Sequence, residues 1–415
     1  MTIAEGSAAT LRFKPYASGT MDPDTISDRS SDPGSSGGQL LRRVSATLNM
    51  RVNATRSQEI LPSRQVRSSR HTSKRVEGSI SGELSPGTYF DLIEAAHRDT
   101  GASFVSKTQS DYTSVVADNA TATLTLGGGD PVGDGLRIGD IITMSGCSVA
   151  ANNRQFQIVG MSGTNGRVLT VYPAPTDMTS DTSFGLARSG QVSSVPSSGH
   201  VKRMFLFERN NSDLDRSRIY EECRITGYRM TIPAEGNATF EAMLMGRRRV
   251  TVSGGSAPFF GSPTAVTSTD VVNTLNGAVY LAGVRIGLVT SITLNFTLAA
   301  DAPAVLGQAY PADILLGTAS CTVEIGFLLD SDDTAATILE NETEVTIVAL
   351  LSSGDFATAN AISICLPRVK INSADEPMQG EGSQAVSCQG EAIEYVGSGT
   401  GVPATTIRIH DTAAS

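Results

Sequence analysis

Histidine, cysteine and serine are the residue types in this chain that could supply metal ligands or catalytic nucleophiles. Metal sites use closely spaced ligands, as in H-E-x-x-H or C-x-x-C, and neither motif occurs in the 415 residues. GSSGG at 34–38 has the letters of the hydrolase motif G-x-S-x-G, but it lies in a loop rich in Ser, Gly, Asp and Pro and does not form the strand-to-helix elbow of that motif. The four histidines are widely separated: His71, His97, His200 and His410. We therefore predict no catalytic residue and no metal site, and we interpret the chain as a protein that is not an enzyme.

The glycine-rich segment GGGDPVGDG at 127–135 is the remaining candidate site, because glycine loops can cradle phosphates. A phosphate-binding loop continues into Lys and a helix, and this segment does neither. We interpret it as a turn and predict no cofactor. His97 is expected to end a helix, where a cation favours the dipole, and its default interpretation is a structural role. Residues 247–249 (RRR) are expected to form a solvated turn.

The cysteines form an odd set without a close pair, which favours reduced and mostly buried thiols. They are Cys147, Cys223, Cys321, Cys365 and Cys388. The first residues, MTIAEGSAATLRFKPY, lack the basic and apolar regions of a secretion signal, and no run of 18 apolar residues occurs. We expect synthesis in a host cytoplasm and no membrane partner.

Composition favours a β-protein and argues against a general nucleic-acid-binding protein. Gly is frequent, Trp is absent, and Thr and Ser recur beside Val, Ile and Leu, a mix that favours short strands and turns over long helices. The formal net charge is −10. A nucleic-acid-binding protein would usually carry a basic surface. The charge is still compatible with a protein that lets DNA pass without holding it.

Two segments show the two-residue period of strands that bury one face. Residues 45–52 and 76–84 alternate apolar and polar side chains, with a polar stretch between them. Pro86 then introduces YFDLIEAAHR, which is expected to form a helix of about three turns. The sequence therefore predicts a strand, a loop, a strand and a helix in this order.

The same order of elements recurs roughly 245 residues later. SATLN at 45–49 has a counterpart in SITLN at 291–295. A loop, an alternating strand at 321–329 and a capped helix after Ser331 follow it. The spacing is preserved to about one residue, which favours an internal duplication over coincidence.

This pattern predicts a mainly β fold with two tandem repeats, each of which includes a short α-helix. Between the halves of the first repeat, turn-rich segments and the hairpin signal Asn165-Gly166 predict a small inserted β-domain. We expect this insert to be self-contained, so that its deletion would spare the rest. The predicted map is an N-terminal arm at 1–40, the first repeat at 41–115 and 196–250, the insert at 116–195, the second repeat at 251–395 and a C-terminal arm at 396–415.

Three stretches resemble the major tail tube proteins of long-tailed, non-contractile bacteriophages. They are SQEILPSRQVRSSRHTSKRVEGSISGELSPGTYFDLIEAAHRDTG at 57–101, KRMFLFER at 202–209 with YEECRITGYRMTIPAEGNATFEAMLMGR at 220–247, and SITLNFTLAAD at 291–301. The resemblance implies that each repeat is a β-sandwich or barrel flanked by a short α-helix. It also implies a virion protein whose rings stack into a tube around a DNA-conducting channel. The implied partners are further copies of the chain, other tail proteins at the tube ends (tape measure, terminator and distal tail) and double-stranded DNA in transit. The tube of a related secretion or injection machine, and a virion-decoration or binding module, remain as alternatives.

The polar faces of the matched strands are the predicted channel lining. DNA carries one charge per roughly 1.7 Å of its axis, so a cationic lining would hold it, whereas an acidic and hydroxyl-bearing lining would not. An ordinary solvent-facing sheet surface is the alternative. The predicted residues are Glu77, Ser79, Ser81, Glu83, Thr322 and Glu324.

Two loop regions of opposite charge are predicted to connect subunits or stacked rings. Residues 42–75 contain nine Lys or Arg and one acid, and residues 299–344 contain nine Asp or Glu and no base. One exposed ion pair contributes only about 0.2–1 kcal/mol, so an effect requires repetition around a ring. Solvated segments without a partner are the alternative. The predicted contact residues are Arg56, Arg64, Arg67, Arg70, Asp301 and Asp313.

The resemblance implies that subunits with one such sandwich close as hexamers, so a duplicated subunit is expected to fill two of the six positions. Three chains would then close a homotrimeric ring with pseudo-sixfold symmetry, because shared strand edges set the rotation between neighbouring units. A homohexamer is the alternative, with the second repeat outside the wall.

Overall fold

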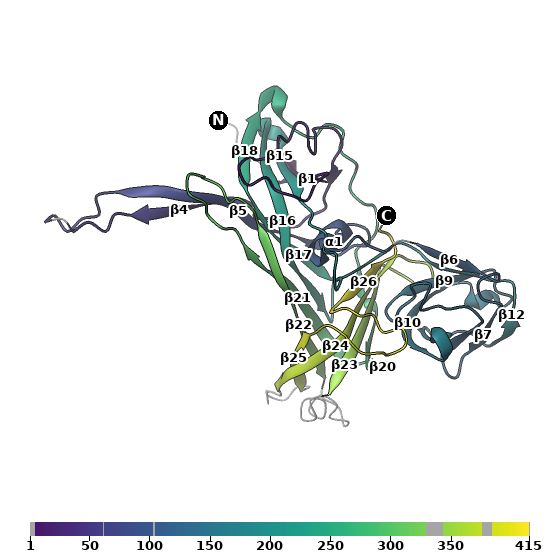
Figure 1. Ribbon diagram of the computed structural model, residues 1–415. Coiled ribbons are helices and arrows are strands. Elements are labelled where there is room, and N and C mark those ends of the chain that lie inside the picture. Colours follow the sequence, from purple (N-terminus) through teal and green to yellow (C-terminus); the bar gives the residue numbers. More distant parts are fainter. Residues whose placement is uncertain (1–4, 61, 103, 329–342, 376–383, 415) are drawn as a thin grey trace.

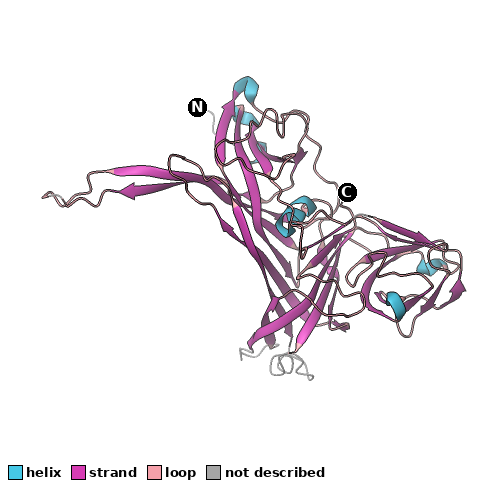
Figure 2. Cartoon of the chain, viewed as in Figure 1, coloured by secondary structure: helices cyan, strands magenta, loops and turns pink. Residues whose placement is uncertain are grey.

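The structure is a computed structural model that describes residues 5–60, 62–102, 104–328, 343–375 and 384–414. Among these residues the one α-helix is α1 (Phe90–His97), and most of the rest is β-strand. Figures 1 and 2 show long strands through the middle, a narrow hairpin projecting on one side and a smaller β-domain on the other. The predicted mainly β class is confirmed. Short 3-10 helices are η1 (Gly6–Ala8), η2 (Ala150–Asn152), η3 (Thr164–Gly166), η4 (Ser212–Leu214) and η5 (Gly254–Ser256).

The first unit begins with a long hairpin, in which β3 and β4 pair antiparallel with β5. The other edge of β5 pairs with β17, and β17 pairs with β16. β15 and β18 pair with the first half of β16. The strands are β3 (Ser45–Ala46), β4 (Asn49–Arg56), β5 (Ser69–Glu83), β15 (Phe205–Asn211), β16 (Arg216–Pro233), β17 (Thr239–Gly246) and β18 (Arg248–Ser253).

The second unit repeats this arrangement. The β21–β22 hairpin pairs with β25 through β22, and β25 pairs with β24. β23 pairs with the first part of β24, and β19 and β20 add a hairpin beside β23. The helix predicted after Ser331 lies outside the described residues. The strands are β19 (Asn273–Leu281), β20 (Val284–Ile286), β21 (Val289–Asp301), β22 (Leu315–Leu328), β23 (Glu344–Ser352), β24 (Ala361–Asp375) and β25 (Ala385–Ala392).

The two units share strand registers as well as strand order. Asn49 lies opposite Glu77 in the first hairpin, and Asn295 lies opposite Thr322 in the second. The ladder between β16 and β17 has a register shift directly after Ile225. The ladder between β24 and β25 has the same shift after Ile371, which is the equivalent residue of the second unit. Because a β-bulge is a specific local feature, its recurrence at one place supports an internal duplication.

A ladder between β16 and β21 joins the two units into one sheet. It runs from Gly227 opposite Thr297 to Pro233 opposite Ser291. The order across the joined sheet is therefore β4, β5, β17, β16, β21, β22, β25 and β24.

The apolar face of the joined sheet and α1 form the main core. Leu92 and Ile93 of α1 are buried in the same cluster as Tyr228, Phe240 and Phe296. The Tyr228 ring stacks on both phenylalanines, with centroids 5.8 and 5.2 Å apart. The helix begins at Phe90, so Pro86 lies in the preceding turn and not at the first helical position.

The inserted domain is a separate eight-stranded sheet. Its β10–β11 hairpin turns at the predicted Asn165-Gly166 pair, where both residues have positive φ (58° and 74°). The strands are β6 (Val105–Thr108), β7 (Ser114–Asp118), β8 (Thr123–Gly127), β9 (Ile141–Ser145), β10 (Gln155–Ser162), β11 (Val168–Tyr172), β12 (Met178–Asp181) and β13 (Gly185–Arg188).

The insert shares a hydrophobic core with the second unit. Phe156 and Ile158 of β10 belong to the same buried cluster as Tyr280, Val348 and Leu350 of β19 and β23. This shared core runs against the expectation that the insert is a self-contained module.

A buried polar contact also ties the insert to the C-terminal strand β26 (Arg408–Asp411). Asp140, which has no solvent exposure, accepts hydrogen bonds from Arg188 at 3.0 Å and from Arg408 at 2.9 Å. Although burial raises the pKa of the Asp140 carboxyl, the two guanidinium groups lower it overall, so the carboxylate stays charged. The amide of Ile141 donates to Nδ1 of His410 at 2.8 Å.

Strands also form within the two terminal segments. β1 (Ala9–Pro15) pairs with β15 and with β2 (Gln39–Leu40), and β26 pairs with β14 (Gln191–Ser194) and β24. Phe13 and Ile409 are buried in the main core. These segments therefore contribute to the core of the molecule.

Candidate channel and assembly surfaces

One face of the joined sheet is polar. Directly opposed residues of neighbouring strands project from the same face. A row of opposed residues crosses the sheet through Ser81, Glu241, Arg229, Asn295 and Thr322. Because alternate residues of one strand share a face, the six predicted channel residues lie together on it. They are Glu77, Ser79, Ser81 and Glu83 on β5, and Thr322 and Glu324 on β22.

The carboxylates of this face have different neighbours. Glu77 is paired with Arg75 and lies 3.5 Å from Arg51, at the base of the projecting hairpin. Glu83 and Glu324 are exposed and accept hydrogen bonds from neutral side chains, those of Asn237 and Ser387. The face away from the hairpin base therefore presents carboxylates, hydroxyls, amides and the guanidinium group of Arg229 to solvent.

The middle of the polar face was not predicted from the sequence. Glu241 and Arg229 lie in segments that the sequence predicted to be strands. The sequence did not show which strands pair with these segments. The signal was present in β17, where buried Phe240 and Ala242 alternate with less buried residues. That alternation places Glu241 on the outer face.

The projecting hairpin β4–β5 carries four of the predicted contact residues. Arg56 is the last residue of β4, and Arg64 and Arg67 lie in the turn. Arg70 lies in β5, opposite Thr55 of β4. All four arginines are exposed, and Figure 1 shows the hairpin extending away from the rest of the chain. The turn also contains two exposed apolar side chains, Ile60 (99% exposed) and Val66 (60%). The tip is therefore both basic and apolar.

The predicted acidic residues lie at the β21–β22 hairpin, whose loop folds back onto the chain. Asp301 is exposed at the end of β21, whereas Asp313 forms an ion pair with buried Arg224 at 2.8 Å. The amide of Lys74 donates to the carbonyl oxygen of Ala309 at 2.8 Å, which holds the loop against β5. Within the described chain, no ion pair joins these acids to the arginines of the hairpin tip.

Arg247 is buried, in contrast to the expected solvated turn at 247–249. Its side chain is 2% exposed and forms an ion pair with fully buried Glu222 at 2.8 Å. It also donates to the carbonyl oxygens of Asp22, Thr25 and Pro311. One guanidinium group therefore links the N-terminal segment, β16 and the β21–β22 loop.

His97 has a structural role at the end of α1, as a neutral ring and not as a cation. Its ring is fully buried and hydrogen-bonds to Ser193 at 2.9 Å and Tyr228 at 2.8 Å. Burial lowers the pKa of His97 to about 3. Burial likewise lowers the pKa of His410, to about 4.

The described residues hold no metal-binding arrangement. No group of three His, Cys, Asp or Glu among them could hold a metal ion. All five cysteines are buried thiols outside any disulfide, as predicted. Across the same described ranges, no helix has the length and apolar character to cross a membrane.

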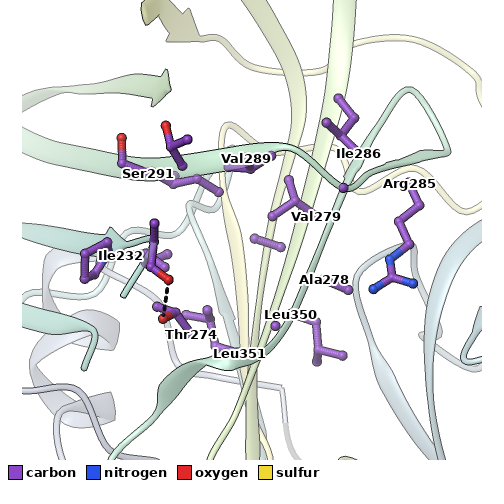
Figure 3. A pocket seen from close by; sticks show the side chains of 17 residues that line it. Ile232, Thr274, Ala278, Val279, Arg285, Ile286, Val289, Ser291, Leu350 and Leu351 are labelled. Carbon is purple, nitrogen blue, oxygen red and sulfur yellow. Dashed lines mark hydrogen bonds between the residues drawn. The ribbon is translucent and has the colours of Figure 1, made fainter. Parts of the chain in front are cut away.

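A cavity of about 170 Å³ lies where β19 and β20 meet β16, β21 and β23. Figure 3 shows mainly small and apolar side chains around it, among them Ile232, Val279 and Leu351. Thr274 donates to the carbonyl oxygen of Ala234 at 3.2 Å, and Arg285 stacks over the ring of Tyr172. The lining residues include no acid–base pair, so the cavity does not resemble a catalytic site.

The family model of phage tail tube proteins matches residues 6–397, which is nearly the whole chain and includes the insert. This chain belongs to the phage tail tube protein family. The match confirms the resemblance of the three sequence stretches to phage tail tube proteins. Among curated proteins, none matches the sequence significantly.

In this tail tube protein, two edges of the joined sheet have no partner strand within the described residues. One is the outer edge of β3–β4, which pairs on its other side with β5. The other is the end of β24, residues 371–375, which pairs with β25 on one side only. Unpaired strand edges are ready to pair with another chain.

Proposed function

We propose that this protein is the structural subunit of the tail tube of a long-tailed, non-contractile bacteriophage. Copies of the chain form closed rings, and the rings stack into a tube. Double-stranded DNA passes through this tube from the capsid to the host. The ends of the tube contact other tail proteins. The observation that carries the proposal is an eight-strand sheet with one polar face and two edges that lack a partner strand in the described part of the chain.

The number of strands argues that several chains form the wall. A closed barrel of eight strands is filled by side chains, whereas barrels of 16–18 strands leave an aqueous channel. Three chains would supply 24 strands. With a spacing of about 4.8 Å and a tilt of about 40°, such a barrel has a diameter of about 48 Å. This leaves a wide, water-filled interior for a DNA duplex.

The ladder between β16 and β21 favours three chains in a ring. It places both units of one chain side by side in a single sheet. Both units therefore lie in the wall, and each chain fills two of six equivalent positions. A homohexamer of full chains would double the number of strands or move one unit out of the wall.

The polar face suits a channel through which DNA slides. Exposed Glu83 and Glu324 on this face repel phosphates, and the hydroxyl and amide groups hydrogen-bond water. A lining without clustered cations avoids the counterion release that drives DNA binding. DNA can then pass without being retained.

Electron microscopy of the purified protein tests the proposal. We expect hollow tubes or stacked rings at high protein concentration. A protein that stays monomeric under all conditions, while folded by circular dichroism, would contradict a tube-forming function.

A further inference from the structure

We propose that the end of β24 in one copy pairs antiparallel with the outer edge of β3–β4 in a second copy. The register is the one that β16 and β21 use within each chain. The proposal rests on the proposed ring assembly and names the contact that closes it. Its occupant is a second copy of this chain.

The first argument is that β24 and β16 are equivalent strands. β15 occupies one edge of β16 up to Cys223, and β23 occupies the same edge of β24 up to Lys370. The bulges after Ile225 and Ile371 fix the residue correspondence between the strands. Beyond the bulge, that edge of β16 pairs with β21, whereas within the described residues that edge of β24 has no partner strand.

The second argument is that β3–β4 and β21 are equivalent strands. Ser45 and Asn49 lie opposite Ser81 and Glu77 of β5. Ser291 and Asn295 hold the same positions in β21, which begins with the same residue pattern. The edge of β21 that faces β16 therefore corresponds to the outer edge of β3–β4.

The internal ladder sets the register between copies. Within one chain, Gly227 lies opposite Thr297, and Arg229 lies opposite Asn295. Transferring this register to the equivalent strands places Ser373 opposite Arg51, Ala374 opposite Met50 and Asp375 opposite Asn49. The bulk of the contact is backbone pairing, which needs no large side chains at an edge.

A charge pair adds to this contact. Arg51 is exposed (73% of its side chain) and lies 3.5 Å from Glu77. In the proposed register the exposed Asp375 is its diagonal neighbour, within the reach of a long side chain. The contact therefore combines a polar backbone edge with opposite charges.

One chain cannot make this contact with itself. β4 and β24 are the two outermost strands of the joined sheet. Seven strand spacings separate them, about 34 Å along the sheet. A disulfide requires Cα atoms about 4.4–6.8 Å apart, so a bond between these edges must join two copies.

A disulfide between introduced cysteines tests the register. We combine Ser373→Cys with Arg51→Cys and oxidise the assembled protein. Because the native cysteines are all buried, new bonds report the introduced pair. We expect covalent dimers and trimers on a non-reducing gel, with at least half of the chains cross-linked. The controls are the two single variants and the pair Ser373→Cys with Thr55→Cys, in which the second cysteine lies four residues after position 51. Each control should give less than a tenth of this yield.

The outcomes separate this contact from the proposed function. Tubes that form normally without a cross-link between positions 373 and 51 would overturn the edge pairing and leave the tube function intact. Equal cross-linking at positions 373 and 55 would overturn the register. A wild-type protein that forms no rings or tubes would contradict the proposed function, whereas a specific cross-link between soluble copies would still support the edge pairing.

Discussion

Arg229 lies directly opposite Asn295 on the polar face of the sheet, where β16 of the first unit meets β21 of the second. The ladder continues on both sides of this pair, from Gly227 to Pro233. Backbone hydrogen bonds therefore fix the angle between the units within one folded chain. If the same angle repeats between chains, the curvature of the ring is already determined in the subunit.

The basic tip of the β4–β5 hairpin is predicted to act in assembly and not in folding. Reversing Arg64, Arg67 and Arg70 to Glu should leave thermal unfolding unchanged, because all three side chains are exposed. Tube yield should fall at least tenfold, because the tip would repel acidic surfaces of neighbouring copies. The triple Arg→Lys variant keeps the charge and should assemble normally. Normal tube yield and length from the folded Glu variant would refute this role.

Arg247 is predicted to be essential for stability. Replacing Arg247 with Ala leaves the Glu222 carboxylate buried without its cationic partner. Breaking a buried ion pair in this way lowers the free energy of unfolding by about 3–5 kcal/mol. Urea unfolding at pH 7 measures the loss. Arg249→Ala removes a partly exposed neighbour and should change the free energy of unfolding by no more than about 0.5 kcal/mol. Similar losses in the two variants would show that the buried network is not the cause.

His97 is predicted to make stability depend on pH. Its pKa is about 3 in the folded chain, below the ordinary value of 6.5. Between these values the unfolded chain binds a proton that the folded chain rejects, so the free energy of unfolding falls as the pH drops. From pH 7 to pH 5 this histidine should contribute a loss of about 2 kcal/mol.

His97→Gln should remove this part of the pH dependence and retain hydrogen-bonding groups. The measurement is urea unfolding at pH 7, 6 and 5 for the variant and the wild type. The exposed His71→Gln serves as the control and should keep the wild-type slope. An unchanged slope in His97→Gln would mean that this imidazole does not stay neutral in the folded chain.

Deletion of the insert is predicted to destabilise the second unit. Replacing 105–188 with a Gly-Ser bridge would expose Tyr280, Val348 and Leu350, and would remove Asp140 from Arg408. Each fully buried large apolar side chain contributes about 1.5–3 kcal/mol, so the loss is comparable with the total stability of a domain. We expect aggregated protein or a much lower melting temperature. A deletion variant as soluble and heat-stable as the full chain would show that the shared core is dispensable.

The sequence predicted elements that depend on local pattern. The alternation around Val76 and Ile80 predicted which face of β5 is buried, and the structure confirms it. The Asn165-Gly166 turn was also predicted, because its positive φ values follow from residue type. The pairing of β16 with β21 could not be predicted, since strand partners distant in sequence are selected by packing in the folded chain.

The burial of polar residues also could not be predicted from the sequence. Arg247 was assigned to solvent because its partners come from segments far apart in the sequence, among them Asp22, Glu222 and Pro311. The docking of the insert did leave a signal in the sequence. Residues 347–351 form a continuous apolar run, which is typical of a strand buried on both faces. That run indicates that another layer covers β23.

The number of chains in one ring tests the central claim most directly. Cryo-electron microscopy of assembled tubes gives the rotational symmetry, and the mass of an isolated ring gives the copy number. The account predicts three chains per ring, with threefold symmetry and a continuous 24-strand inner wall, since each chain contributes eight strands. Six full chains around the channel, with only one unit of each in the wall, would contradict it.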